Sequence, residues 1–292
     1  MRPLTITMCL FDNFLDMNKF IICVLWLTIS SFCHAQEVLD TVAYRFVYDV
    51  QLKTMESSKY LDSDEHWLDI GKNGITSYFS AWKSQRATLL DSLYRVGGDQ
   101  FDMQRTLQDR GIETSYFDYY VYKNVPATGK QTVILTSADY FQYEEEMGQV
   151  WNLEDGDSLI LNHPCSKATT NYHGRIWNVW FAQDIPIADG PWKLCGLPGL
   201  ILAAKDSKAE FVFRCIGILD NPNDLIKKRK DRLITTTPFR VHRSYEFCIT
   251  DFDSYMNAKH GVGTGRSVLL DRNGKMIPKS KTKRVFIETY KH

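Results

Sequence analysis

Hydrophobic and polar positions alternate with a period of two over much of the chain. Residues 41–54 combine this alternation with β-branched and aromatic side chains, and they predict an opening strand. The turn sequence Gly-Lys-Asn-Gly at 71–74 separates two further predicted strands, at 66–70 and 75–80. Short loops favour antiparallel neighbours in the second half as well. There the alternation predicts strands at 149–153, 166–170, 175–181, 200–205 and 210–219.

The alternation is interrupted between Ala81 and Arg110, where hydrophobic residues recur at helical intervals and Gly97-Gly98 breaks the pattern. This stretch predicts a helical or irregular excursion over one sheet face. Aromatic residues crowd positions 116–122, which indicates a strand in a large sheet, with a stacking platform for a ring-bearing ligand as the alternative. We therefore predict a mainly β (α+β) fold, a curved antiparallel sheet with a few helices packed on one face, in which the layout resembles a half-barrel.

The N-terminal region has the order of a secretory signal: Lys19, then the apolar run 20–29, then small residues up to Ala35. A membrane-spanning helix needs about 20 apolar residues, and this run is about half as long. We expect residues 1–35 to be a removed signal peptide, with Met17 as an alternative start, and the protein to be located in the periplasm or cell envelope. It is not expected to be an integral membrane protein.

Charge changes this picture little, because the chain has 35 basic and 35 acidic residues. The balance gives no support to nucleic-acid binding. Hydrophobic residues make up 44% of the chain, enough for a sizeable core. We expect one domain over residues 36–292, with a basic C-terminal tail from about residue 261, and no cofactor.

Four cysteines follow the predicted signal peptide. An even number in an oxidising compartment predicts at least one disulfide, with the pairing left open and buried free thiols as the alternative. Zinc is disfavoured because no C-x-x-C spacing occurs. The four residues are Cys165, Cys195, Cys215 and Cys248.

The most distinctive stretch is residues 190–202, which read Gly-Pro-Trp-Lys-Leu-Cys-Gly-Leu-Pro-Gly-Leu-Ile-Leu. Proline followed by glycine at Pro198-Gly199 predicts a type II turn, in which Gly199 needs a positive φ. We interpret the motif as structural first and as a possible binding element second. The residues of this motif are Gly190, Pro191, Trp192, Gly196, Leu197, Pro198, Gly199, Leu200 and Ile201.

With this hexapeptide Gly-Leu-Pro-Gly-Leu-Ile, the chain resembles the GLPGLI family of exported Bacteroidetes-type proteins, whose function is unknown. The blocks Gly174-Arg175-Ile176-Trp177 and Trp180-Phe181 resemble that family's core in the same order. The resemblance implies an association with outer-membrane transport systems, and so a possible outer-membrane protein partner.

No common catalytic motif is present in the sequence. The titratable residues nearest the motif are Arg175, Asp184, Asp189 and Lys193, for which we expect structural pairing or solvation. The acidic stretch 154–157 offers a calcium site only if its carboxylates converge. We therefore predict a non-catalytic binding or interaction module. The alternatives are a lipid or lipoprotein carrier with an apolar concave face and an enzyme of unrecognised type.

Overall fold

The computed structural model describes residues 37–229, 232–260 and 284–289. The predicted signal peptide, the glycine-rich stretch 261–265 and most of the basic tail lie outside these residues. Contacts divide the chain into two units, of which the larger comprises residues 39–226 and 231–292. The smaller comprises residues 1–38 and 227–230, and within it the Lys228 amide donates to the Glu37 carbonyl (2.9 Å).

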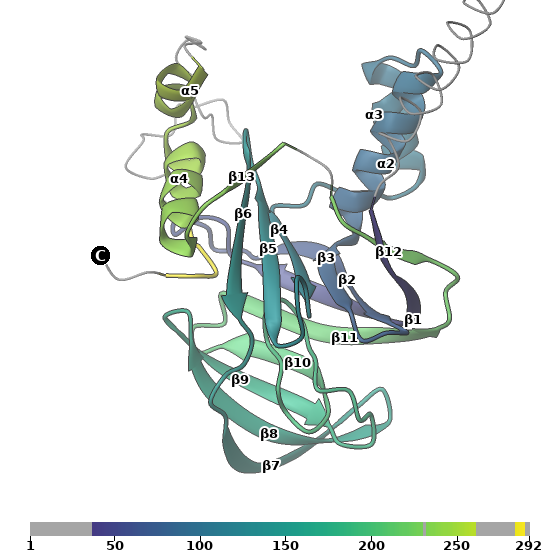
Figure 1. Ribbon diagram of the computed structural model, residues 1–292, viewed down its shortest axis with the longest axis vertical. Helices are drawn as coiled ribbons and strands as arrows, with labels where there is room; N and C mark the ends of the chain where they lie inside the picture. The colour runs from purple at the N-terminus through teal and green to yellow at the C-terminus, as the bar shows by residue number, and fades with distance from the viewer. Residues whose placement is uncertain (1–36, 230–231, 261–283, 290–292) are drawn as a thin grey trace, which may run out of the picture. The chain divides into compact units, whose positions relative to one another are not determined.

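The described residues form one sheet of 13 strands in the order β13-β6-β5-β4-β3-β2-β1-β11-β10-β9-β8-β7, with β12 paired to β1 off this path (Figure 1). All strand pairs in this order are antiparallel except β13 with β6. The strands are β1 (Val38–Leu52), β2 (Asp62–Gly71), β3 (Thr76–Ser80), β4 (Tyr119–Lys123), β5 (Lys130–Thr136), β6 (Tyr140–Glu146), β7 (Asn152–Ile160), β8 (His163–Tyr172), β9 (Arg175–Ala182), β10 (Leu200–Asp206), β11 (Phe211–Asp220), β12 (Leu225–Lys227) and β13 (Leu233–Thr235).

Four helices accompany the sheet in the described residues: α2 (Ala81–Arg95), α3 (Gln100–Asp109), α4 (Pro238–Thr250) and α5 (Phe252–His260). Ser80 caps α2 by accepting a hydrogen bond from the Lys83 amide (3.1 Å). Gly97, with φ 75°, follows α2, and a capping box at Asp99 starts α3. None of these helices has the length and apolar character that a bilayer span requires.

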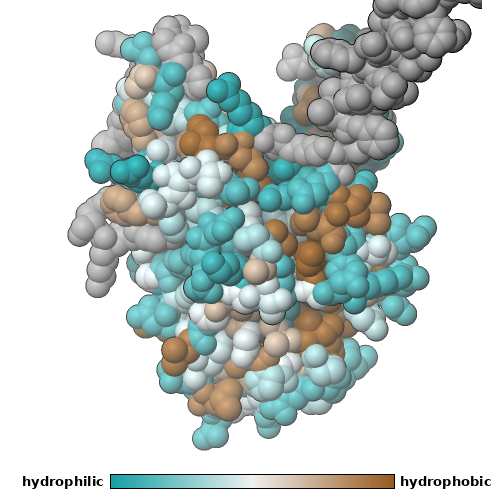
Figure 2. Space-filling view, viewed as in Figure 1, coloured by the Kyte–Doolittle hydropathy of each residue, from teal (hydrophilic) through white to brown (hydrophobic). Residues whose placement is uncertain are grey.

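The long strand β1 shows how sequence alternation builds the core. Phe46, Tyr48, Val50 and Leu52 are buried on one face, and a bulge between Val47 and Tyr48 changes the register against β11. They join a core of hydrophobic residues from most strands, from α4 and α5, and from the segment between β9 and β10. Figure 2 shows hydrophilic residues interspersed with smaller hydrophobic groups on the visible face.

The predicted fold class, a mainly β antiparallel sheet with a few helices, is confirmed. The predicted helical stretch forms α2 and α3, with the break at Gly97-Gly98 as expected. Strands β5, β6, β12 and β13 and helix α4 were not predicted, and the strand predicted at 149–153 forms β7 at Asn152–Ile160. The aromatic strand begins at Tyr119, later than predicted.

Candidate functional site

The segment between β9 and β10 folds back on itself within the core. We call residues 185–201 the motif segment. Its amides bond to its own carbonyls, from Gly196 to Ala188 (3.0 Å) and from Leu200 to Ile185 (3.1 Å). Of the predicted motif residues only Gly196 and Pro198 are exposed. The motif segment is therefore packed into the hydrophobic core, whereas the alternative of a lipid carrier requires an open apolar face.

A buried ion pair holds the motif segment to β4. The Lys123 ammonium, fully buried, contacts the Asp189 carboxylate and donates to the carbonyls of Gly190 (2.8 Å) and Leu194 (3.1 Å). Asp189 also accepts from the Thr76 hydroxyl (2.8 Å). These contacts satisfy both charges, and they fix the entry of the segment into the core.

A second buried lysine, Lys193, lies between two carboxylates. Its ammonium is 2.7 Å from Glu145 and 2.6 Å from Glu288. His242 contacts the second oxygen of Glu288 (2.8 Å), and the Tyr143 hydroxyl accepts from Lys193 (2.5 Å). Burial alone would raise the pKa of Glu288, yet the attraction of Lys193 and His242 holds that pKa well below its usual value. Within this cluster, both carboxylates therefore share the Lys193 ammonium as a counter-charge.

Trp192 is the strained residue of the motif. It is fully buried with φ 54°, a left-handed conformation that costs about 1–3 kcal/mol in a residue other than glycine. Its indole N–H has no hydrogen-bond partner among the described residues. The ring packs against Trp177 and Tyr172, with centroids 5.5 and 5.7 Å away. Packing of these rings compensates the strain.

The prediction of positive φ at Gly199 is wrong. The left-handed glycine of the motif is Gly196 (φ 89°), and Gly199 has no positive φ. Gly199 is needed for another reason, because a Cβ there would come within 2.2 Å of the Ala182 carbonyl oxygen. The Pro-Gly sequence thus permits a close backbone contact with the end of β9.

The predicted disulfide is not present in the structure. Cys165, Cys195, Cys215 and Cys248 are all free and buried, which is the alternative that the sequence left open. Burial raises the pKa of Cys215 to about 12.

The four titratable residues near the motif do not converge. Lys193 and Asp189 belong to separate clusters, and Asp184 pairs with His163 at the surface (2.8 Å). Arg175 bonds to Asp206 (2.6 Å) at the start of β9. In the acidic stretch, Glu154 pairs with Lys167 (2.7 Å). No group of ligating side chains within the described residues suits a metal ion.

Arg175 also holds a second segment, residues 284–289, which we call the tail segment. Its guanidinium donates to the carbonyls of Phe286 (2.6 Å) and Ile287 (3.0 Å). The Val285 amide donates to the Thr54 carbonyl (3.1 Å) just after β1. Together with the pairing of Glu288, these bonds place the tail segment beside α4 and the end of β1.

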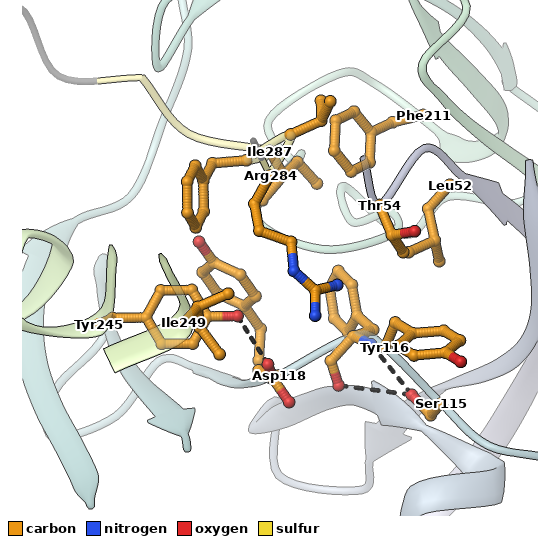
Figure 3. A pocket seen from close by; sticks show the side chains of 14 residues that line it. Leu52, Thr54, Ser115, Tyr116, Asp118, Phe211, Tyr245, Ile249, Arg284 and Ile287 are labelled. Atoms are coloured by element: carbon orange, nitrogen blue, oxygen red, sulfur yellow. Dashed lines mark hydrogen bonds between the residues drawn. The ribbon is translucent and has the colours of Figure 1, made fainter. Parts of the chain in front are cut away.

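A pocket of about 200 Å³ opens beside the tail segment (Figure 3). We call it the tail pocket. Its walls come from the end of β1, the stretch before β4, the start of β11, α4 and the tail segment. Aromatic side chains form much of its surface. The lining residues are Leu52, Thr54, Ser115, Tyr116, Phe117, Asp118, Tyr119, Phe211, Tyr245, Ile249, Arg284, Val285, Phe286 and Ile287.

Most polar groups of the tail pocket already have partners. Asp118 pairs with Lys83 and accepts from the Tyr245 hydroxyl (2.6 Å). Thr54 donates to Asp62 (2.6 Å). The guanidinium of Arg284 differs, since it points into the pocket in Figure 3 and has no hydrogen-bond or ion-pair partner in the described part of the chain. As far as residues 37–229, 232–260 and 284–289 show, the tail pocket thus presents one positive charge without a counter-charge beside aromatic rings.

Ser115 lies at the edge of a buried polar network. Its hydroxyl donates to Asp64 (2.5 Å), and the same carboxylate lies 3.1 Å from His66. The order of contacts is therefore serine, aspartate, histidine. In a nucleophilic triad the histidine contacts the serine and takes its proton, and here the carboxylate occupies that place. This arrangement does not activate Ser115 as a nucleophile.

The sequence did not indicate the tail pocket. Its aromatic wall includes residues from the predicted aromatic stretch, so the alternative of a ring-binding surface had a basis there. Arg284 belongs to the predicted basic C-terminal tail, and no local pattern showed that it returns to the aromatic stretch and α4.

The described residues thus define a mainly β protein in which the motif segment is packed into the core and the tail pocket lies beside the tail segment. Residues 119–203 match a protein family described as "Protein of unknown function (Porph_ging)", which is well under half of the chain. No curated protein matches the sequence.

Two solved structures are similar to part of the chain. They are described as "Structure of PNGF-II in P21 space group" and "Structure of PNGF-II in C2 space group", both 11% identical, with TM-scores of 0.43 and 0.42. The similarity covers 70% and 68% of this chain and 33% and 32% of theirs, so the chain spans about a third of their length. At these values the similarity supports no statement about activity.

Proposed function

We propose that this protein is an exported, non-catalytic binding module of the cell envelope that holds a small organic carboxylate in the tail pocket. The observation that supports this most is the Arg284 guanidinium, which has no ion-pair partner among the described residues and lies in a pocket with aromatic walls. The proposed location rests on the signal sequence before Gln36.

The ligand class follows from charge and shape. A guanidinium binds a carboxylate through two parallel hydrogen bonds. Asp118 is already neutralised by Lys83, so an incoming anion meets a net positive site. Phe117 and Phe211 supply apolar surface for the body of the ligand. A carboxylate attached to an aromatic ring or short aliphatic group fits these features.

Size argues for a compact ligand. Sites for drug-sized molecules measure about 300–1,000 Å³, and the tail pocket has about 200 Å³. A long acyl chain has less support, because the motif segment occupies the interior that a carrier would need. The order of contacts at Ser115 likewise favours binding over catalysis.

The test is ligand-observed NMR and calorimetry on protein that begins at Gln36. The probes are N-acetylphenylalanine, which has a carboxylate, and N-acetylphenylalanine amide, which lacks the charge. We expect the acid to bind at least tenfold more tightly, because a hydrogen bond to a charged group contributes about 1.5–3 kcal/mol.

Arg284→Gln should remove this preference, and Arg214→Gln is the matched control because Arg214 is exposed on β11. Equal binding of acid and amide, or an unchanged affinity in Arg284→Gln, would contradict the proposal. Stoichiometric lipid in the purified protein would support the carrier instead.

A further inference from the structure

Strand β7 forms one end of the sheet and pairs only with β8 among the described residues (Figure 1). The backbone groups along its other side are therefore available to another strand. The opposite end of the sheet offers less, because β13 has only three residues. Open edges of this kind are where extended peptides add to a sheet.

The β7 edge exposes aliphatic side chains. Val150, just before the strand, is 86% exposed, and Leu153 and Leu159 are 68% and 67% exposed. Leu161, after the strand, is also exposed. Figure 2 shows hydrophobic residues at the lower end of the view, the region in which Figure 1 draws β7. A partner strand would bury part of this apolar surface.

The same edge is acidic. Asp155 and Asp157 are exposed and have no ion pair within the described residues, whereas Glu154 is neutralised by Lys167. The carboxylates lie at a bulge in β7 between Glu154 and Asp157. Charged residues and bulges protect sheet edges from self-association. Pairing of β7 with β7 of a second copy would bring four like charges together, so a second copy is the wrong partner.

We infer that β7 is a docking strand for an extended segment of a partner protein that carries lysine or arginine and aliphatic residues on the same face, because Leu153, Asp157 and Leu159 lie opposite every second residue of β8. Backbone hydrogen bonds would supply affinity along the open side of β7. The basic side chains would meet Asp155 and Asp157, and the aliphatic ones would cover Leu153 and Leu159. This surface is separate from the tail pocket, so each proposal can fail without the other.

The test uses two synthetic peptides and the protein that begins at Gln36. In one peptide lysine and valine take turns at every second position, with threonine between them, and in the matched control glutamate replaces each lysine. We expect the lysine peptide to bind at least tenfold more tightly by calorimetry. Hydrogen exchange should then slow at the amides of residues 152–160.

A double variant then reverses the charge at the β7 edge. Asp155→Lys with Asp157→Lys should lose the lysine peptide and gain the glutamate peptide, a result that a merely unfolded variant cannot give. Asp109→Lys with Glu113→Lys, two exposed carboxylates near the end of α3, is the matched control and should behave like the parent. Equal binding of both peptides, no binding of either, protection at another strand, or a dimer in light scattering would overturn the inference.

Discussion

The interior of the sheet and the tail pocket use charge in opposite ways. In the interior, Lys123 and Lys193 are buried and surrounded by carboxylates and carbonyls. In the tail pocket, the Arg284 guanidinium faces open space. Buried charges are tolerated when every partner is supplied by the fold. A charge that the described fold leaves unpaired is available to a ligand.

The residues that match the family include most of the paired charges of the interior but almost none of the tail pocket. Residues 119–203 include the motif segment, both buried lysines and Glu145, but only Tyr119 of the tail pocket lining. The distinctive sequence therefore specifies the scaffold. In the proposed function, binding specificity belongs to residues outside that stretch.

The largest effect in this comparison is expected for Lys193→Met. Methionine removes the ammonium and leaves Glu145 and Glu288 buried without their shared counter-charge. Removing one member of a buried ion pair typically costs about 3–5 kcal/mol. Urea denaturation of the variant should show a loss of this size in the free energy of unfolding. Lys208→Met, at an exposed turn, is the control and should change it by less than about 0.5 kcal/mol.

Gly199→Ala is expected to have the next largest effect. Its Cβ would meet the Ala182 carbonyl oxygen, and overpacking against backbone costs about 1–3 kcal/mol. Gly196→Ala is the matched variant, since it has open space but a φ of 89° and should cost about 1 kcal/mol. Thermal melts of both proteins would test this order. A more stable Gly199→Ala than Gly196→Ala would show that close approach is not the reason for this glycine.

Acid should lower the free energy of unfolding, because it protonates Glu288. Its pKa is lower in the folded than in the unfolded state, so the stabilisation is complete above the unfolded value near 4.5 and is lost as pH falls below it. Denaturation between pH 6 and 3 should show a steeper decline for the parent than for Glu288→Gln, by up to about 1.4 kcal/mol per pH unit. Parallel curves would contradict the assignment. The groups that face Glu288 are Lys193, His242, His173, Tyr143 and Glu145.

No disulfide should contribute to the free energy of unfolding. A disulfide would contribute about 2–4 kcal/mol, so we expect adding a reductant to change the free energy of unfolding by less than about 0.5 kcal/mol. Denatured, non-reduced protein that begins at Gln36 should take up one alkylating label at each of its four cysteines. Native Cys215 should react slowly because its pKa is raised to about 12. Fewer labels would restore the disulfide prediction.

Sequence patterns predicted the parts of the fold that depend on local alternation. Strands β8 to β11 and the helical break at Gly97-Gly98 follow from side-chain periodicity and turn residues. Strand β4 was misplaced at its start, because the aromatic residues Tyr116 and Phe117 line the tail pocket before the strand begins. In the motif, the positive φ values lie at Trp192 and Gly196, and the one predicted at Gly199 is not found.

The tail pocket lay beyond such patterns because its groups come from distant parts of the chain. Asp118, Tyr245 and Arg284 meet only after the tail segment docks through Arg175 and Glu288. Nothing in the residues around Arg284 distinguishes it from a solvated arginine. Long-range docking of this kind is set by tertiary contacts, which periodicity does not encode.

The smallest effect on stability is expected for Arg284→Gln, and it gives the sharpest test of the comparison. Arg284 has no hydrogen bond or ion pair to lose among the described residues, so the free energy of unfolding should stay within about 0.5 kcal/mol of the parent. The same change should weaken binding of N-acetylphenylalanine at least tenfold. Lys193→Met shows the reverse pattern, a large loss of stability through a residue outside the pocket lining. A large destabilisation by Arg284→Gln would mean that its charge supports the fold, and the distinction between the paired interior and the ligand-facing pocket would then be lost.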